Sequence, residues 1–170
     1  MGYARRMSRS RHTARLVTLS FALRDDRVLL RRHADDGDRF PGQWNGIGGH
    51  VEPGEDVRAA ARRELLEETG LIADLRLGGV VHESGLVGAH HVLFVFVGDA
   101  SHGSLRPEPG VELAWQPLER LDALPLVHDV PLLLGRALDA REVFFATERY
   151  DGGDLCTQLR FDEPGAAHAG

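Results

Sequence analysis

Three glutamates near the middle of the chain have the type and spacing to carry chemistry. Glu64, Glu67 and Glu68 stand at positions i, i+3 and i+4 in residues 56–69, a segment without glycine or proline. On an α-helix these carboxylates share one face, with Cβ atoms about 5–6 Å apart, so they repel one another. A solvated, salt-bridged face is one explanation, because Arg63 can pair with Glu67. One guanidinium cannot neutralise three acids, however, and hard oxygen ligands without cysteine suit Mg²⁺ or Mn²⁺.

The residues around these acids follow a longer pattern. In order it reads Gly49, five residues, Glu55, seven residues, Arg63-Glu64, an aliphatic Leu65, one residue, Glu67-Glu68, one residue, Gly70 and an aliphatic Leu71. This pattern resembles the box of the Nudix hydrolase family at every defined position. Seven identities at fixed spacing make the match far more specific than a lone glycine motif.

The resemblance implies a fold and a reaction. The fold is of the α+β class, an α/β/α sandwich with a mixed β-sheet, in which the box forms a loop-helix-loop. The box holds a divalent metal, Mg²⁺ with Mn²⁺ as a substitute, on a diphosphate that water attacks. This role agrees with the general chemistry of divalent ions, which neutralise phosphate charge and activate water.

The resemblance also assigns roles by position. The implied metal site comprises Glu64, Glu67, Glu68, Gly49 and a further acid outside the box, for which Glu112 is our candidate. An acid at a strand edge is the alternative interpretation of Glu112. Glu64 is a metal ligand or the general base, and Arg63 with Glu55 braces the loop against the helix.

Sequence signatures outside the box narrow the range of candidate substrates. No proline occurs between Pro53 and Pro107, and the only tyrosines are Tyr3 and Tyr150, which weakens resemblance to ADP-ribose pyrophosphatases and dinucleoside polyphosphate hydrolases. The segments that resemble MutT-like oxidised-purine nucleoside triphosphatases are Leu29-Leu30-Arg31-Arg32, Trp44-Asn45-Gly46-Ile47-Gly48-Gly49 and Val130-Pro131-Leu132-Leu133-Leu134. The likeness runs from about Leu16 to Asp162.

Three residues of these segments are candidates for substrate binding. Asn45 would read the purine edge, or else serve as a turn residue. Arg32 would contact the triphosphate, or else be an exposed charge at a strand end. Trp44 would stack on the base, or else belong to the core. The animal oxidised-purine nucleoside triphosphatases carry adjacent aspartates where this chain has Pro125-Leu126, and Asp129 is the only acid close by. This difference leaves specificity for 8-oxo-purines open.

The resulting prediction is a hydrolase that converts a nucleoside triphosphate into the monophosphate and pyrophosphate, with 8-oxo-dGTP or a related purine nucleotide as the candidate. Its partner is therefore a small-molecule nucleotide. An ADP-ribose or nucleotide-sugar pyrophosphatase is the alternative within the enzyme class. From another class, a Nudix-like module could bind a nucleotide without cutting it, but such modules typically lack box acids, and all are present here.

Other candidate ligands have simpler explanations. His82, His90 and His91 could form a zinc site, but adjacent His90 and His91 should face opposite sides of a strand, so we favour structural roles. Cys156 is the sole cysteine and cannot form an internal disulfide. We expect a half-buried thiol in a reducing, cytoplasmic compartment.

The elements that must position the box follow from apolar patterns and turn residues. We expect a hairpin of strands 14–23 and 27–33, a structured loop over 34–49, a helix over 56–69 capped by Asp56 and Gly70, strands over 75–83, 91–98 and 112–115, a helix over 131–140, and a hairpin of strands 142–150 and 155–161. The absence of a regular βαβ rhythm favours a mixed sheet between helices.

Length and charge limit the remaining possibilities. A chain of 170 residues with 42% hydrophobic content predicts one domain, residues 14–163, between a disordered basic tail at 1–13 and a disordered end at 164–170. Five arginines in the first fifteen residues leave residues 16–170 with a charge of −11, which repels polyanions. We expect no stable nucleic-acid or membrane partner, and a monomer or homodimer.

Overall fold

The computed structural model describes residues 13–35, 39–86, 89–107, 110–139, 142–153 and 155–162. The predicted C-terminal tail and all but the last residue of the predicted basic tail lie outside these residues. The described strands are β1 (Arg15–Arg24), β2 (Arg27–Arg32), β3 (Trp44–Asn45), β4 (Ile47–His50), β5 (Ile72–Leu86), β6 (Ala89–His102), β7 (Glu112–Pro117), β8 (Phe144–Tyr150) and β9 (Cys156–Phe161). The helices are α1 (Val57–Thr69), the 3-10 helix η1 (Leu118–Ala123) and α2 (Val130–Asp139).

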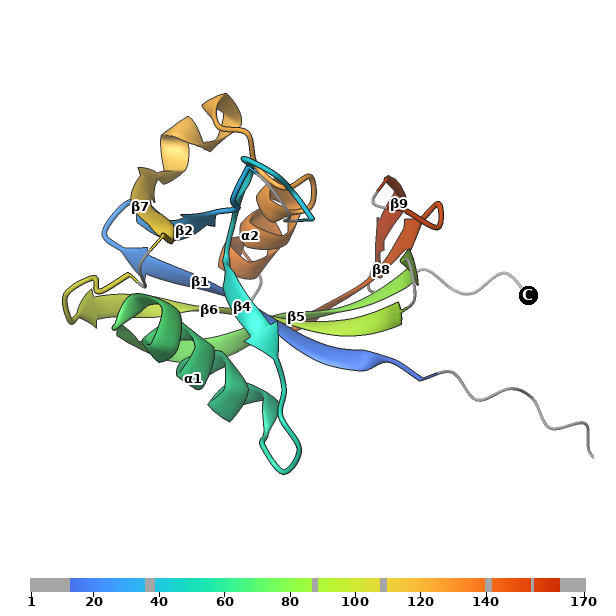
Figure 1. The fold of residues 1–170 in the computed structure, drawn as a ribbon, viewed down its shortest axis with the longest axis horizontal. Coiled ribbons are helices and arrows are strands. Elements are labelled where there is room, and N and C mark those ends of the chain that lie inside the picture. Colours follow the sequence, from blue (N-terminus) through green and yellow to red (C-terminus); the bar gives the residue numbers. More distant parts are fainter. Residues whose placement is uncertain are drawn as a thin grey trace, which may run out of the picture.

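The strands form one sheet in the order β3-β2-β1-β6-β5-β8-β9, with β4 paired to β1 and β7 paired to β2. The pairs β1·β6 and β5·β8 are parallel and the other pairs antiparallel, which confirms the predicted mixed sheet and both hairpins. Helices α1 and α2 lie on opposite sides of this sheet (Figure 1). The layers are therefore those of the predicted α/β/α sandwich.

Helix α1 begins and ends where its capping residues require. The Asp56 carboxylate accepts hydrogen bonds from the backbone N–H groups of Arg58 and Ala59, which lack partners within the helix. Gly70 adopts the left-handed conformation, with φ of 73°, and its N–H donates to the carbonyl of Leu66. The predicted helix over 56–69 is confirmed. Its buried face fixes the helix against the sheet, which leaves Glu67 exposed while Glu64 and Glu68 are largely buried.

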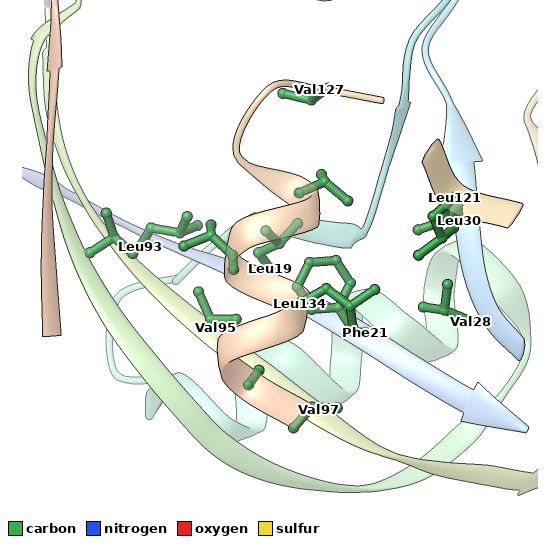
Figure 2. Packing of buried hydrophobic residues seen from close by; sticks show 14 of the residues in the cluster. Leu19, Phe21, Val28, Leu30, Leu93, Val95, Val97, Leu121, Val127 and Leu134 are labelled. Atoms are coloured by element: carbon green, nitrogen blue, oxygen red, sulfur yellow. The ribbon is translucent and has the colours of Figure 1, made fainter. Parts of the chain in front are cut away.

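Helix α2 covers the other face of the sheet through four buried side chains at helical spacing, Val130, Leu133, Leu134 and Ala137. Figure 2 shows Leu134 packed among Leu19, Phe21 and Val95 in this core. Full burial of each large apolar side chain contributes about 1.5–3 kcal/mol of stability. Within the described residues, no helix is long and apolar enough to cross a membrane.

The predicted loop over 34–49 is only partly correct, because β3 and β4 lie within it. β4 pairs with β1 from Ser20↔Ile47 to Val17↔His50. A Cβ on Gly48 would collide with the backbone of Thr18, so glycine permits this close approach rather than preventing a strand. The strands predicted over 75–83 and 91–98 are also longer than expected, because pairing between β5 and β6 extends beyond their apolar centres.

Candidate active site

Arg63 is the centre of the box in the folded protein. Its Nε and Nη2 atoms each donate to one carboxylate oxygen of Glu55 at 3.0 Å, and Nη2 also donates to the backbone carbonyl of His50 at 3.0 Å. The hydrogen bond from Arg63 lowers the pKa of Glu55, and the same contact raises the pKa of Arg63. This bidentate pair joins the loop before α1 to the helix and to the end of β4.

The same guanidinium holds two of the three predicted metal ligands. Arg63 Nη1 donates to Glu64 at 2.9 Å and to Glu67 at 3.1 Å. Glu68 lies on the side of β2, with a carboxylate oxygen 3.8 Å from Arg31 Nη1. Among the described residues, the three acids do not bring ligand atoms within 4.8 Å of one another. They share a helix face, as predicted, and Arg63 bridges two of them.

Gly49 provides the space in which Glu64 lies. A Cβ built on Gly49 would overlap the Glu64 carboxylate, so only glycine lets this side chain rest against the backbone of β4. The atoms here that could bind a metal are carboxylate oxygens and the Gly49 carbonyl oxygen. The Gly49 carbonyl accepts a hydrogen bond from Thr18 Oγ1 at 3.5 Å. An all-oxygen set of this kind fits a hard divalent cation.

Glu112 and Arg32 lie beside each other on paired strands. They are register partners in β7 and β2, with Arg32 Nη1 3.5 Å from a Glu112 oxygen. Arg32 Nη2 is also 2.8 Å from Asp35. Within the described residues, Glu112 joins Arg32 rather than a ligand group with the box acids.

A cavity of about 210 Å³ opens beside the box. Residues of β1, β2, β4, β5, β6 and the turn before α2 contribute to its wall. Asn45 lines this cavity, with its Nδ2 atom 3.5 Å from His33 Nε2, while its Oδ1 atom accepts a hydrogen bond from the Gly46 N–H at 2.8 Å. Asn45 therefore has the local turn contact and also faces a space where a ligand could lie.

Strand β4 connects the cavity with the box. Gly48 and His50 line the cavity, and Gly49 between them supports Glu64. Arg31 makes a second connection, since it lines the cavity and also approaches Glu68. Arg31 was not among the residues predicted from the sequence, which named its neighbour Arg32. Neighbouring residues of a strand face opposite sides of the sheet, so Arg31 and Arg32 had to point in opposite directions. The sequence did not tell which of the two sides holds the cavity.

Comparisons with known proteins agree with this geometry. The family model described as NUDIX domain matches residues 13–133, more than half of the chain. The chain belongs to the Nudix family. It is 36% identical over 131 residues to a mouse protein named oxidized purine nucleoside triphosphate hydrolase, covering 72% of this chain and 81% of the mouse protein.

Two further relatives extend the comparison. A zebrafish protein with the same name is 29% identical over 158 residues, covering 89% of this chain and 96% of the zebrafish protein. The crystal structure of a MutT protein from Bacillus halodurans superimposes with a TM-score of 0.75 at 24% identity, covering 88% of this chain and 99% of the bacterial one. That structure supports the Nudix fold independently of close sequence identity.

Trp44 lies in the core of this Nudix domain. Its side chain is 7% exposed and belongs to the apolar cluster beneath α2, outside the cavity wall. Its backbone N–H donates to the Pro125 carbonyl and its carbonyl accepts from the Val127 N–H. Of the two interpretations of Trp44, the structure agrees with a place in the core. Its backbone contacts anchor the segment that leads into α2.

Three buried acids cluster at the cavity, and Asp129 is the only one of them noted from the sequence. Glu83, Asp129 and Glu148 are 7%, 6% and 0% exposed. Burial raises the pKa of Asp129 to about 7. A signal for Glu148 was present, because residues 144, 146 and 150 of the same alternating strand are apolar or aromatic and face inward.

The three histidines considered as a zinc site and the cysteine lie as predicted. His91 Nδ1 is 3.0 Å from Glu83, whereas the ring of His90 is beside that of His82, with centroids 6.3 Å apart. The two adjacent histidines thus face opposite sides of β6. Cys156 is a half-buried free thiol, and burial raises its pKa to about 11, so it is largely protonated at neutral pH.

Proposed function

We propose that this Nudix protein hydrolyses a nucleoside triphosphate to the monophosphate and pyrophosphate, with purine nucleotides, including oxidised ones such as 8-oxo-dGTP, as its substrates. The observation that carries the proposal is the arrangement of β4. Alternate residues of this strand line the cavity and support the first acid of the box. A base in the cavity would therefore have its phosphates beside the acidic face of α1.

The box residues have distinct roles in this proposal. Glu64, Glu67, Glu68 and the carbonyl of Gly49 would hold Mg²⁺, with Mn²⁺ as a substitute. The ion supplies positive charge for the phosphate oxygens and makes water a better nucleophile. Glu64 is also placed to accept a proton from the attacking water, because its carboxylate is fixed between β4 and Arg63.

Arg63 and Glu55 act through other groups rather than on the substrate. Their bidentate pair holds the loop, and the remaining N–H groups of Arg63 orient Glu64 and Glu67. A cation that took the carboxylates of Glu64 and Glu67 would leave Arg63 its two bonds to Glu55 and its bond to the His50 carbonyl, because these do not involve the two acids. The brace therefore does not depend on Glu64 or Glu67.

Basic and amide side chains would hold the rest of the nucleotide. Asn45 would read the purine edge, since its amide carries both donors and an acceptor. Arg31 lines the cavity and approaches the box, which suits a phosphate contact. Arg32 would have to exchange its carboxylate partners, Asp35 and Glu112, for a phosphate, and Glu112 would then be released toward the metal.

The relatives support the substrate class. The mouse and zebrafish proteins are both named for hydrolysis of oxidised purine nucleoside triphosphates. All acids of the box are present in this chain, which favours catalysis over binding alone. ADP-ribose and nucleotide sugars remain the alternative substrates to test.

A product screen tests the proposal. Purified protein with Mg²⁺ is incubated with canonical and oxidised purine and pyrimidine nucleoside triphosphates, ADP-ribose and nucleotide sugars, and the phosphate products are identified by chromatography. Pyrophosphate and a purine monophosphate, formed by the wild type and not by Glu64→Gln, are the expected products. Selective cleavage of ADP-ribose or a nucleotide sugar, or binding of every nucleotide without cleavage, would contradict the proposal.

A further inference from the structure

Three carboxylates converge behind the cavity on elements far apart in the sequence. Glu83 in β5 and Glu148 in β8 are direct register partners in a parallel strand pair, and Asp129 comes from the turn that begins α2. One oxygen from each of the three lies within 4.8 Å of the other two. Glu83 and Asp129 line the cavity, so the cluster is adjacent to it.

The contacts of these acids leave two buried oxygens without hydrogen-bond partners. His91 holds one oxygen of Glu83 at 3.0 Å, and His128 holds Oε1 of Glu148 at 2.6 Å. Oδ1 of Asp129 and Oε2 of Glu148 are buried and have no hydrogen-bond partner among the described residues. Buried polar atoms are ordinarily paired, so these two oxygens indicate a ligand that binds between them.

The charge of the cluster also calls for a cation. Three carboxylates in a buried setting repel one another strongly, because solvent screens them little. His91 and His128 each contact an oxygen of Glu83 or Glu148, and neither is hydrogen-bonded to Asp129. Arg39 lines the same cavity and adds one positive charge near the cluster. A positive ion that contacted all three carboxylates would reduce their repulsion further and would offer a partner to the unpartnered oxygens.

The geometry accommodates one ion. For three atoms no more than 4.8 Å apart, there is always a point within about 2.8 Å of all of them, close to the 2.3–2.6 Å bonds of Ca²⁺. Small inward rotations would reach the shorter bonds of Mn²⁺ or Mg²⁺. We propose that Glu83, Asp129 and Glu148 form a second divalent-cation site, separate from the Nudix box and open to the cavity.

A hard cation fits this site better than zinc. The three converging ligand atoms are all carboxylate oxygens, the ligands that Ca²⁺, Mn²⁺ and Mg²⁺ prefer. A neighbouring group, His128, Glu148 and Cys156, offers mixed nitrogen, oxygen and sulfur atoms within the same distance. That group shares only Glu148 with the carboxylate site, so the two can be separated by mutation.

The test removes the box ion and counts what remains. In the full-length Glu67→Gln/Glu68→Gln protein, Mn²⁺ binding is measured by equilibrium dialysis and electron paramagnetic resonance, with Ca²⁺ as a competitor. We expect about one Mn²⁺ per chain to remain bound, and Ca²⁺ to displace it. Adding Asp129→Asn should weaken Mn²⁺ binding at least tenfold and abolish any rise in Tm caused by the ion.

Matched variants separate a site from a change of fold. Glu119→Gln, on the exposed surface of η1, should leave Mn²⁺ binding in this background unchanged. Circular dichroism verifies folding, and the isosteric Asp129→Asn carries the test if Glu148→Gln does not fold. The proposal is overturned if the box-deficient protein binds no ion, if Asp129→Asn binds as well as its parent, or if the retained ion is zinc that depends on Cys156. Because binding is measured without nucleotide, the result is independent of the proposed hydrolysis.

Discussion

Glu64 rests its carboxylate against the backbone of Gly49, in the space that a Cβ at position 49 would fill. Gly49→Ala should therefore displace Glu64 from between β4 and Arg63. A displacement of about 1 Å in a catalytic group can cost about a hundredfold in rate, so we expect kcat to fall between about tenfold and a hundredfold. Steady-state kinetics, with circular dichroism to verify the fold, measure this effect.

A matched glycine in the same protein provides the control. A Cβ at Gly135, within α2, would meet nothing within 4 Å. Gly135→Ala should leave kcat unchanged and raise the free energy of unfolding by up to about 1 kcal/mol, because alanine is the better helix former. Equal kinetic losses in both variants would show that the contact between Gly49 and Glu64 has no special role.

The box and α1 could be predicted because their signals are local. The capping residues Asp56 and Gly70 and the spacing of the acids all lie within one short stretch, and helical geometry alone puts the acids on one face. The contact between Gly49 and Glu64 could not be predicted from such local signals. It depends on β4 pairing with β1, about thirty residues earlier, and the glycines of β4 do not resemble a strand pattern.

The buried acids show the same limit more clearly. Glu83 and Glu148 become neighbours only because β5 and β8 pair in parallel, and no pattern within either segment specifies that register. The alternation of β8 indicates that Glu148 faces inward, but not what it faces. Prediction from the sequence therefore covers the helix with the box acids, and the fold is needed for the cavity and its wall.

Removal of the metal ion should stop the reaction. Glu67 lies on the exposed side of α1 and its side chain pairs with Arg63, so Glu67→Gln should preserve the fold while reducing kcat at least about tenfold. Excess EDTA should abolish wild-type turnover, and added Mg²⁺ should restore it. Glu119→Gln serves as the control, with kcat expected at the wild-type value. Full turnover in EDTA would refute metal dependence.

Asn45 should contribute to base selectivity. Asn45→Ala removes the amide from the cavity and should reduce kcat/KM for purine triphosphates more than for pyrimidine triphosphates. It also removes the hydrogen bond to the Gly46 N–H, which costs about 1 kcal/mol of stability. Asn45→Asp retains that acceptor and lacks the amide donors, so it should lose purine preference with a smaller change in Tm. Equal losses for purines and pyrimidines would leave Asn45 only its turn role.

The pair of Glu55 and Arg63 should make stability depend on pH at the acidic end. The hydrogen bond from Arg63 lowers the pKa of Glu55 below its ordinary value of 4.5, so the folded protein holds this carboxyl ionised more firmly than the unfolded chain does. Its contribution is therefore fully present above pH 4.5 and is lost as the pH falls through the lowered value.

Urea unfolding of the wild type and Glu55→Gln between pH 7 and pH 3 measures this contribution. The wild type should have the larger free energy of unfolding at pH 7, and the difference should shrink below pH 4.5 as Glu55 becomes protonated in the wild type. Glu52→Gln, an exposed neighbour, should follow the wild type throughout. Equal stability of the two proteins at pH 7 would mean that Glu55 stabilises the loop by its shape rather than by its charge, because glutamine preserves the shape and removes the ionisable group.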